Sequence, residues 1–228
     1  MFFDNIVFGD DEKMEERYKT IHKKGKDEIT INKSRFIGHV LPISSEEDAL
    51  DFLNEIKSIY KDATHNVYGY VFGENNNIQR YSDDGEPQGT AGIPILEVIK
   101  KEDLRNVAVV VTRYFGGIKL GAGGLIRAYT KSAKIAIESG IIVEKVLHRK
   151  LIIKIDYSIY GKVENFFLSR GIIISNVIFN EAVNIEVFVS FFEKSSFISS
   201  VIDLCNGRVE IEELGEKYLS LKDCKNIY

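Results

Sequence analysis

Residues 107–127 constrain the fold of this chain more than any other stretch. They read Val-Ala-Val-Val-Val-Thr-Arg-Tyr-Phe-Gly-Gly-Ile-Lys-Leu-Gly-Ala-Gly-Gly-Leu-Ile-Arg. The apolar, β-branched start is typical of a buried strand, and the glycines mark a turn before the start of a helix. Five residues of the turn have no Cβ atom, so they permit positive φ angles and let a ligand approach the backbone: Gly116, Gly117, Gly121, Gly123 and Gly124.

The same turn has the composition of an anion site. Amides at the start of a helix have no partners within the helix, and the positive end of the helix dipole lies behind them. There is no acidic residue from Leu104 to Ile137, although the whole chain has a net charge of −4. The stretch holds six basic residues: Arg105, Arg113, Lys119, Arg127, Lys131 and Lys134.

Two interpretations of this turn stay open. Glycine-rich turns also serve close packing, and Arg127, Lys131 and Lys134 have the spacing of an ordinary solvated helix face. The turn matches neither the phosphate loop nor the dinucleotide-binding fingerprint, so it names no nucleotide. We therefore predict a phosphate-like anion at the turn and leave the identity of the ligand open.

Length and composition limit the classes of protein. A chain of 228 residues permits one large core or two smaller ones. No apolar run approaches the ~20 residues that span a bilayer, and the first residues lack the basic start and cleavage site of a signal peptide. We expect a cytoplasmic protein that does not contact a membrane. Two cysteines, Cys205 and Cys224, are too few for a disulfide framework or a cysteine metal cluster, and we expect no metal and no cofactor.

The first part of the chain mixes strand and helix patterns. We expect a hairpin of residues 18–21 and 29–41, a helix capped by Ser44 or Ser45, a second hairpin of residues 67–72 and 78–83, a helix capped by Thr90 that runs to about residue 101, and the helix after the glycine turn, ending at Gly140. These elements predict one domain over residues 1–144.

The second part follows a different order. Strand, helix, strand, strand, helix and strand patterns are expected over residues 148–159, 160–169, 172–179, 183–192, 195–206 and 208–214. This β-α-β-β-α-β order is the ferredoxin-like arrangement, with both helices on one face of the sheet. It predicts a second domain over residues 145–228 and an α+β chain overall. We assign Phe188, Phe191 and Phe192 to its core rather than to an RNA-stacking surface.

A second polar motif lies at residues 81–92, Tyr-Ser-Asp-Asp-Gly-Glu-Pro-Gln-Gly-Thr-Ala-Gly. Asp83, Asp84 and Glu86 supply oxygen ligands for Mg²⁺, which would bridge to a phosphate at the glycine turn. The favoured interpretation is ordinary turn chemistry, because these residue types make turns routinely and their spacing fits no calcium loop. His65 either acts as a general base or satisfies a strand end. The sequence contains no Ser-His-Asp set and no metal-binding pair of histidines.

Four segments together resemble one known family. They are Ser34-Arg-Phe, His65-Asn-Val-Tyr-Gly-Tyr, residues 82–92 and residues 110–129. Their order and spacing are similar to those of the IMPACT/YigZ family in its bacterial two-domain form, over roughly residues 17–222. Members often carry a basic residue at the position of Ile93 and a neutral one at Lys119, so cation placement is not a fixed family feature.

This resemblance implies a fold and a field of activity. It implies an N-terminal domain like the second domain of ribosomal protein S5, and a C-terminal domain like domains III and V of elongation factor G. Both implied similarities are to proteins of translation, so the resemblance implies a role in translation. Eukaryotic relatives regulate translation initiation by binding a protein that activates a stress kinase, so RNA, the ribosome or a translation-related protein is the expected partner.

Residues and resemblance together give two main competing functions, and a third, peptide cleavage, ranks last because the sequence offers no nucleophile–base pair. The favoured one is a non-catalytic binding protein in translation regulation, with no assigned catalytic residue. The alternative is a Mg²⁺-dependent enzyme that acts on a phosphorylated small molecule or nucleotide. The candidate ligand-binding residues are His65, Asp83, Asp84, Gly85, Glu86, Thr90, Gly92, Arg113, Tyr114, Phe115, Gly116, Gly117, Lys119, Gly121, Gly123, Gly124 and Arg127.

Overall fold

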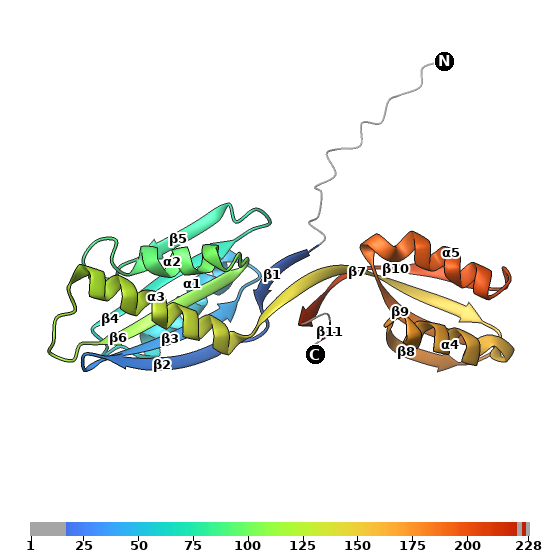
Figure 1. Ribbon diagram of the computed structural model, residues 1–228, viewed down its shortest axis with the longest axis horizontal. Helices are drawn as coiled ribbons and strands as arrows, with labels where there is room; N and C mark the ends of the chain where they lie inside the picture. The colour runs from blue at the N-terminus through green and yellow to red at the C-terminus, as the bar shows by residue number, and fades with distance from the viewer. Residues whose placement is uncertain (1–16, 223–224, 227–228) are drawn as a thin grey trace, which may run out of the picture.

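The computed structural model describes residues 17–222 and 225–226, which form two antiparallel sheets and five α-helices (Figure 1). The sheets lie toward opposite ends of an elongated molecule, and the α+β class is as expected. Among the described residues, no helix is long and apolar enough to cross a membrane.

The first sheet has its two faces covered by helices. Its strand order is β2 (Gly25–Ile31), β3 (Ser34–Pro42), β6 (Val107–Tyr114), β4 (His65–Phe72) and β5 (Ile78–Ser82). One face packs against α2 (Gly92–Lys101) and α3 (Gly121–Gly140), and the other against α1 (Glu46–Ile59).

This double cover explains the unbroken apolar run of β6. Val107, Val109 and Val111 pack in the core under α2 and α3. Ala108 and Val110 point the other way and join the core under α1. A strand buried on both faces needs no polar residue at alternate positions, so the run predicts the burial correctly.

The helix starts follow local capping chemistry only in part. Ser45 caps α1, and the Ser45 hydroxyl accepts a hydrogen bond from the amide of Asp48 while the Asp48 carboxylate accepts one from the amide of Ser45. The second predicted hairpin forms as β4 and β5, and α3 ends at Gly140 as expected.

The first predicted hairpin is wrong. β1 (Arg17–Ile21) pairs with β7 (Ile142–Ile155) of the second sheet, not with a neighbour in sequence. The actual hairpin joins β2 and β3 through Asn32 and Lys33, whose φ angles are 45° and 62°. Two central residues with positive φ make the kind of two-residue turn that suits a hairpin. Without a glycine, this turn gave no recognisable signal.

The second sheet confirms the predicted β-α-β-β-α-β order. It contains β7, α4 (Tyr160–Ser169), β8 (Ile173–Phe179), β9 (Val183–Ser190), α5 (Lys194–Leu204) and β10 (Glu210–Lys222), with a short β11 (Lys225–Asn226) beyond β10. The strand order β10-β7-β9-β8 is ferredoxin-like. Phe167 of α4 and Phe197 of α5 pack in one core with alternate residues of β7 and β9.

All three aromatic residues assigned to that core lie outside it, and Phe188 is half-buried on the other face of β9. Phe191 and Phe192 begin a short 3₁₀ helix (Phe191–Glu193) and are 37% and 57% exposed, which corrects their assignment to the core. The guanidinium groups of Arg149 and Arg17 lie 5.5 and 5.6 Å from the centroids of these two rings. The two arginines belong to β1 and β7, far from Phe191 and Phe192 in sequence, so the local pattern around the two rings did not predict these contacts.

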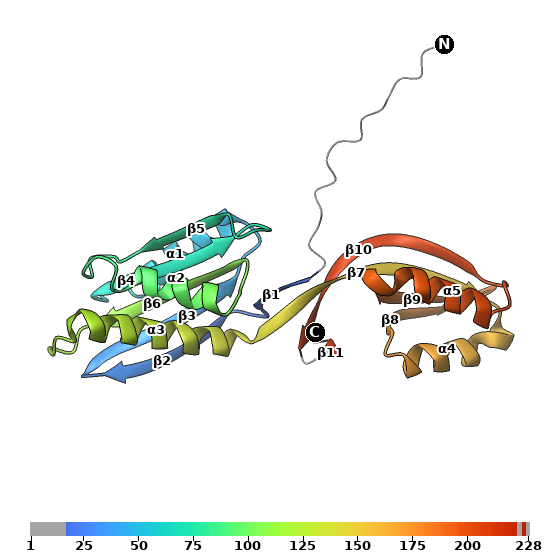
Figure 2. The same ribbon diagram turned by 45° about the horizontal axis from the view of Figure 1, so that its top comes forward.

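β7 extends from the second sheet toward the first domain (Figure 2). Its residues 142–146 pair with β1, its residues 148–155 pair with β9, and β10 runs along its other edge. The predicted domain boundary at 144/145 therefore falls inside this strand. Separate folding of the two parts remains a prediction.

Candidate functional site

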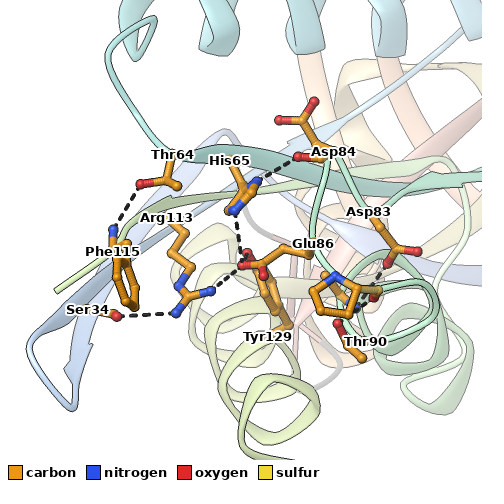
Figure 3. A network of polar contacts seen from close by, with 12 residues as sticks. Ser34, Thr64, His65, Asp83, Asp84, Glu86, Thr90, Arg113, Phe115 and Tyr129 are labelled. Carbon is orange, nitrogen blue, oxygen red and sulfur yellow. Dashed lines mark hydrogen bonds and ion pairs between the residues drawn. The ribbon is translucent and has the colours of Figure 1, made fainter. Parts of the chain in front are cut away.

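The polar motif of residues 81–92, called the acidic turn below, and the glycine turn of residues 116–124 meet at one end of the first sheet. Arg35 of β3 pairs with Tyr114 of β6, and His65 of β4 pairs with Arg113 of β6. The start of β3, the start of β4 and the end of β6 therefore lie together, and the two turns follow β5 and β6 into the same region (Figure 3).

Glu86 is the centre of a buried polar network. It is 8% exposed, and its Oε1 atom accepts hydrogen bonds from Arg113 Nη1 at 2.5 Å and from the Tyr129 hydroxyl at 2.8 Å. Burial and the charge of Glu86 raise the pKa of Tyr129, which keeps the phenol protonated and able to donate. This contact ties the acidic turn to β6 and α3 at once.

Arg113 is held in this network through its two terminal nitrogens, while its buried Nε atom has no hydrogen-bond partner among the described residues. It is 5% exposed, its Nη2 atom lies 3.4 Å from Ser34 Oγ, and the Ser34 hydroxyl also accepts the amide of Gly116 at 3.1 Å. The guanidinium carbon lies 5.3 and 5.5 Å from the ring centroids of Phe36 and Phe115. Because Glu86 neutralises it, Arg113 is not a free cation for a ligand, contrary to the way the sequence pattern groups it.

His65 joins the acidic turn to the same centre. Its Nδ1 atom lies 2.7 Å from the carbonyl oxygen of Asp84, and its Nε2 atom lies 3.8 Å from Glu86 Oε1. A carbonyl oxygen only accepts, so Nδ1 carries the proton. The Asp84 carboxylate accepts the backbone amide of Asn66 at 2.6 Å, and Asp84 has a φ angle of 44°. His65 and Asp84 thus close the turn against the start of β4.

Asp83 caps α2 from a distance. Its carboxylate accepts the amides of Gly89 at 2.8 Å, Ala91 at 3.1 Å and Gly92 at 2.8 Å. Thr90, the predicted cap, instead donates its hydroxyl to the carbonyl oxygen of Pro87 at 2.6 Å. The cap was misassigned because the residue that satisfies these amides lies six to nine positions earlier in the chain.

Two glycines of this region have different roles. A Cβ atom on Gly92 would lie 2.8 Å from the carbonyl group of Ser82, so only glycine fits there. Gly85 has a φ angle of 86° and permits the reversal of the acidic turn. Both glycines are thus required by the backbone of the acidic turn itself.

The three carboxylates do not converge. Figure 3 shows those of Asp83, Asp84 and Glu86 pointing in different directions, and each accepts hydrogen bonds from the partners described above. Within the described ranges, no group of three or more His, Cys, Asp or Glu residues has the arrangement of a metal site. The arrangement gives a rigid, mutually satisfied turn.

The glycine turn is open, in contrast. Gly117 and Gly121 have φ angles of 83° and 69°, and no atom lies within 4 Å of a Cβ built on either. Gly116 and Gly124 have packing roles, since their Cβ atoms would contact the backbone of Lys33 and the side chain of Leu120. Of the five glycines, Gly117, Gly121 and Gly123 thus leave the turn accessible.

The start of α3 carries unsatisfied positive potential. Leu120 precedes the helix without a side-chain cap, and the first turn holds no acidic residue. Lys119 and Arg127 are exposed, and Arg127 Nη1 lies 3.7 Å from a Cβ built on Gly123, so it reaches back over the first turn. A cavity of about 360 Å³ at this place is lined by Glu86, Pro87, Arg113, Phe115, Lys119, Leu120, Gly121, Ala122 and Leu125.

Some predicted residues lie elsewhere, and others were missed. The Tyr114 hydroxyl donates to Asp62 at 2.9 Å, outside this cavity. Lys33 is exposed beside Gly116 and was not among the predicted residues. Ser34 and Tyr129 were also missed as site residues. The hydroxyl of Tyr129, on the buried face of α3, was a usable signal because a buried phenol usually finds a partner.

Comparison with known proteins agrees with the sequence motifs. The Impact N-terminal domain matches residues 32–137, and a domain of unknown function, DUF1949, matches residues 153–208. The IMPACT family member YvyE from Bacillus subtilis (strain 168) is 45% identical over 202 residues, which cover 89% of this chain and 93% of the relative. The chain belongs to the IMPACT family.

Other IMPACT relatives match different shares of the chain. The IMPACT family member YigZ from Escherichia coli (strain K12) is 41% identical over 101 residues, 43% of this chain and 50% of YigZ. The IMPACT homologue of Dictyostelium discoideum is 40% identical over 97 residues, 41% of this chain and 28% of that protein. A crystal structure described as that of a hypothetical protein is 26% identical, with a TM-score of 0.56 over 88% of this chain and 98% of its own. The expected two-domain α+β fold is confirmed.

Proposed function

We propose that this IMPACT family member is a non-catalytic, cytoplasmic binding protein of translation regulation. Its ligand surface is the open start of α3 with Lys33, Phe115, Lys119 and Arg127, which binds the phosphate groups of RNA. The observation that carries the proposal is the uncapped helix start, whose exposed glycines lie between exposed cations with no acidic residue in the first turn. Ribosomal RNA is included in this ligand class.

The contacts suit a phosphate chain better than an isolated ion. Helix-start amides and cations act on the same negative groups, and each charge-assisted contact contributes about 1.5–3 kcal/mol. Phe115 is 46% exposed beside the cavity and offers a ring on which a base can stack. The buried network described above holds the turn in place without taking part in binding.

A pair of charge-reversal variants tests this function. Lys119→Glu with Arg127→Glu should weaken binding of a labelled single-stranded RNA by about a hundredfold, because two charge-assisted contacts are lost. Fluorescence anisotropy at several salt concentrations measures the effect. The salt dependence should fall by about 0.7 in log–log slope for each lost phosphate contact.

The matched control is Lys131→Glu with Lys134→Glu. It makes the same change in net charge on the same helix, at exposed positions farther from its start. Ribosome co-sedimentation with the same variants tests the ribosome as the source of the RNA. Equal losses in both variants would show that only total charge matters, and RNA binding unchanged by the first variant would rule out this surface.

The alternative, a Mg²⁺-dependent enzyme, receives no support from the geometry of the carboxylates. The Asp83 carboxylate accepts hydrogen bonds from three backbone amides, the Asp84 carboxylate accepts one, and Glu86 pairs with Arg113. Assays for nucleotide hydrolysis and phosphoryl transfer with Mg²⁺ present test it directly. Metal-dependent turnover well above background would favour the enzyme over the binding protein.

A further inference from the structure

A second cavity lies where the first domain meets the second sheet, away from the glycine turn. It has a volume of about 410 Å³, and its walls come from β7, β8, β9, β10 and His22, the residue after β1. The backbone amide of His22 donates to the carbonyl oxygens of Gly140 and Ile141 at 3.1 and 2.8 Å. One wall of this junction cavity is therefore fixed to the end of α3, and the others belong to the second sheet.

The junction cavity is lined by basic side chains and by no acidic one. The basic side chains are His22, Lys145 and Lys217. Within the part of the chain that the structure describes, no hydrogen bond or ion pair engages the ammonium group of either lysine. Lys150 and Lys154 of the same sheet, in contrast, pair with Glu186 and Glu210, each at 2.7 Å.

The two lysines are close enough to influence each other. Burial lowers the pKa of Lys145, and the positive charge of Lys217 lowers it further. Lys145 is half-buried and Lys217 is exposed, and an anion bound between them would relieve their repulsion. The same place therefore favours a ligand with more than one negative charge.

The remaining walls add an apolar surface. Phe188, Ile173 and Leu219 line the cavity together with the hydroxyl-bearing Ser220. Small-molecule sites typically have volumes of about 300–1,000 Å³ and combine apolar walls with a few polar groups that fix orientation. The cavity has this size and this combination.

We propose that the junction cavity binds a small organic phosphate, a phosphate monoester carried on a flat apolar body. The dianionic phosphate lies between Lys145, Lys217 and His22, and the apolar body packs against Phe188 and Ile173. This site is separate from the start of α3 and does not depend on the proposed RNA binding. Because His22 is held by the end of α3, a bound molecule would contact both domains.

The test uses 1-naphthyl phosphate as the probe, with 1-naphthol and inorganic phosphate as its two halves. Isothermal titration calorimetry on the full chain should show one site for 1-naphthyl phosphate and much weaker binding of either half. Lys145→Met with Lys217→Met should weaken binding at least tenfold, since the apolar walls remain and the charge-assisted contacts are lost.

Two control variants make the result specific. Lys23→Met changes an exposed lysine next to His22 that does not line the cavity, and it should bind the probe like the wild type. The Lys119→Glu and Arg127→Glu variant should also bind normally, which separates this site from the one at α3. If the double methionine variant does not fold, Lys217→Gln at an exposed position replaces it.

Three outcomes would overturn the proposal. They are no binding of 1-naphthyl phosphate by the wild type, equal binding by the wild type and the lysine variants, and equal affinity for 1-naphthol, which would show an apolar pocket without phosphate recognition. Tight binding of the probe that the lysine variants lose, while Lys23→Met keeps it, would support the site.

Discussion

The acidic turn and the glycine turn lie side by side and have opposite relations to solvent. The polar groups of the acidic turn are taken up by protein partners, with Glu86 buried against Arg113 and Asp83 bound to three amides. The glycine turn leaves exposed cations and the open start of α3. Two polar motifs of similar appearance in the sequence therefore differ in the fold: one is held by buried protein contacts, and the other is open to solvent.

The largest expected effect comes from breaking the buried ion pair. Glu86→Gln should lower the free energy of unfolding by about 3–5 kcal/mol, because the Arg113 guanidinium stays buried without a compensating charge. Urea unfolding followed by circular dichroism measures the loss. A second variant, Glu86→Gln with Arg113→Met, should recover part of it.

Glu97→Gln is the control for that experiment. Glu97 forms an ion pair with Lys100 at 2.8 Å on the surface, and its loss should cost no more than about 0.5 kcal/mol. Similar small losses in both variants would contradict the view that Glu86 holds the acidic turn.

A smaller loss is expected from the distant cap of α2. Asp83→Ala should lower the free energy of unfolding by about 1–2 kcal/mol, since three amides at the helix start lose their acceptor. Asp62→Ala removes an exposed carboxylate that accepts one hydrogen bond, from the Tyr114 hydroxyl, among the described residues, and it should change stability much less. Thermal unfolding of the two variants gives the comparison, and equal midpoints would refute the capping role.

Variants of the glycine turn should keep their stability and lose RNA binding, in contrast to variants of the acidic turn. Lys119→Glu with Arg127→Glu changes exposed side chains and should leave the free energy of unfolding within about 0.5 kcal/mol of the wild type, while RNA binding falls. Chemical unfolding and anisotropy on the same samples separate the two quantities. A large loss of stability would mean that this turn, too, is structural.

The smallest effect is expected for Asp84→Asn in catalytic assays. Its carboxylate accepts one backbone amide, and an asparagine oxygen can accept the same bond. Nucleotide hydrolysis with Mg²⁺ should be negligible in the wild type and in the variant. Turnover that disappears in the variant without loss of thermal stability would assign chemistry to the acidic turn.

Local signals predicted much of this fold. The β-branched run of residues 107–111 identified the central strand. The two predicted caps, Ser44 and Ser45, located the start of α1 to within one residue, and Ser45 is the actual cap. The order of elements after residue 145 identified the second sheet. Each of these signals depends on neighbours in sequence or on a short periodic pattern.

The rest depends on residues that are distant in sequence. Nothing near Arg113 in the chain shows that Glu86 neutralises it, and nothing near Thr90 shows that Asp83 has taken its role as a cap. A count of charges therefore drew attention to the glycine turn and did not reveal that Arg113 is paired with Glu86. The partner of a buried polar group depends on which segments the fold brings together, and the spacing of residues along one sequence does not show this.

The pairing of β1 with β7 has a consequence for synthesis of the chain. Ile21 pairs with Ile142, so β1 leaves the ribosome while its partner, about 120 residues later, has not yet been made. At about 5–20 residues per second, this interval is on the order of ten seconds. During that time the first sheet can assemble, because all five of its strands precede β7. The junction cavity and its His22 wall can form only afterwards, so any molecule that binds there recognises a chain whose translation has passed both domains. Pulsed proteolysis of nascent chains stalled before residue 142 and well after residue 155 would show whether β1 gains protection only once β7 has been made.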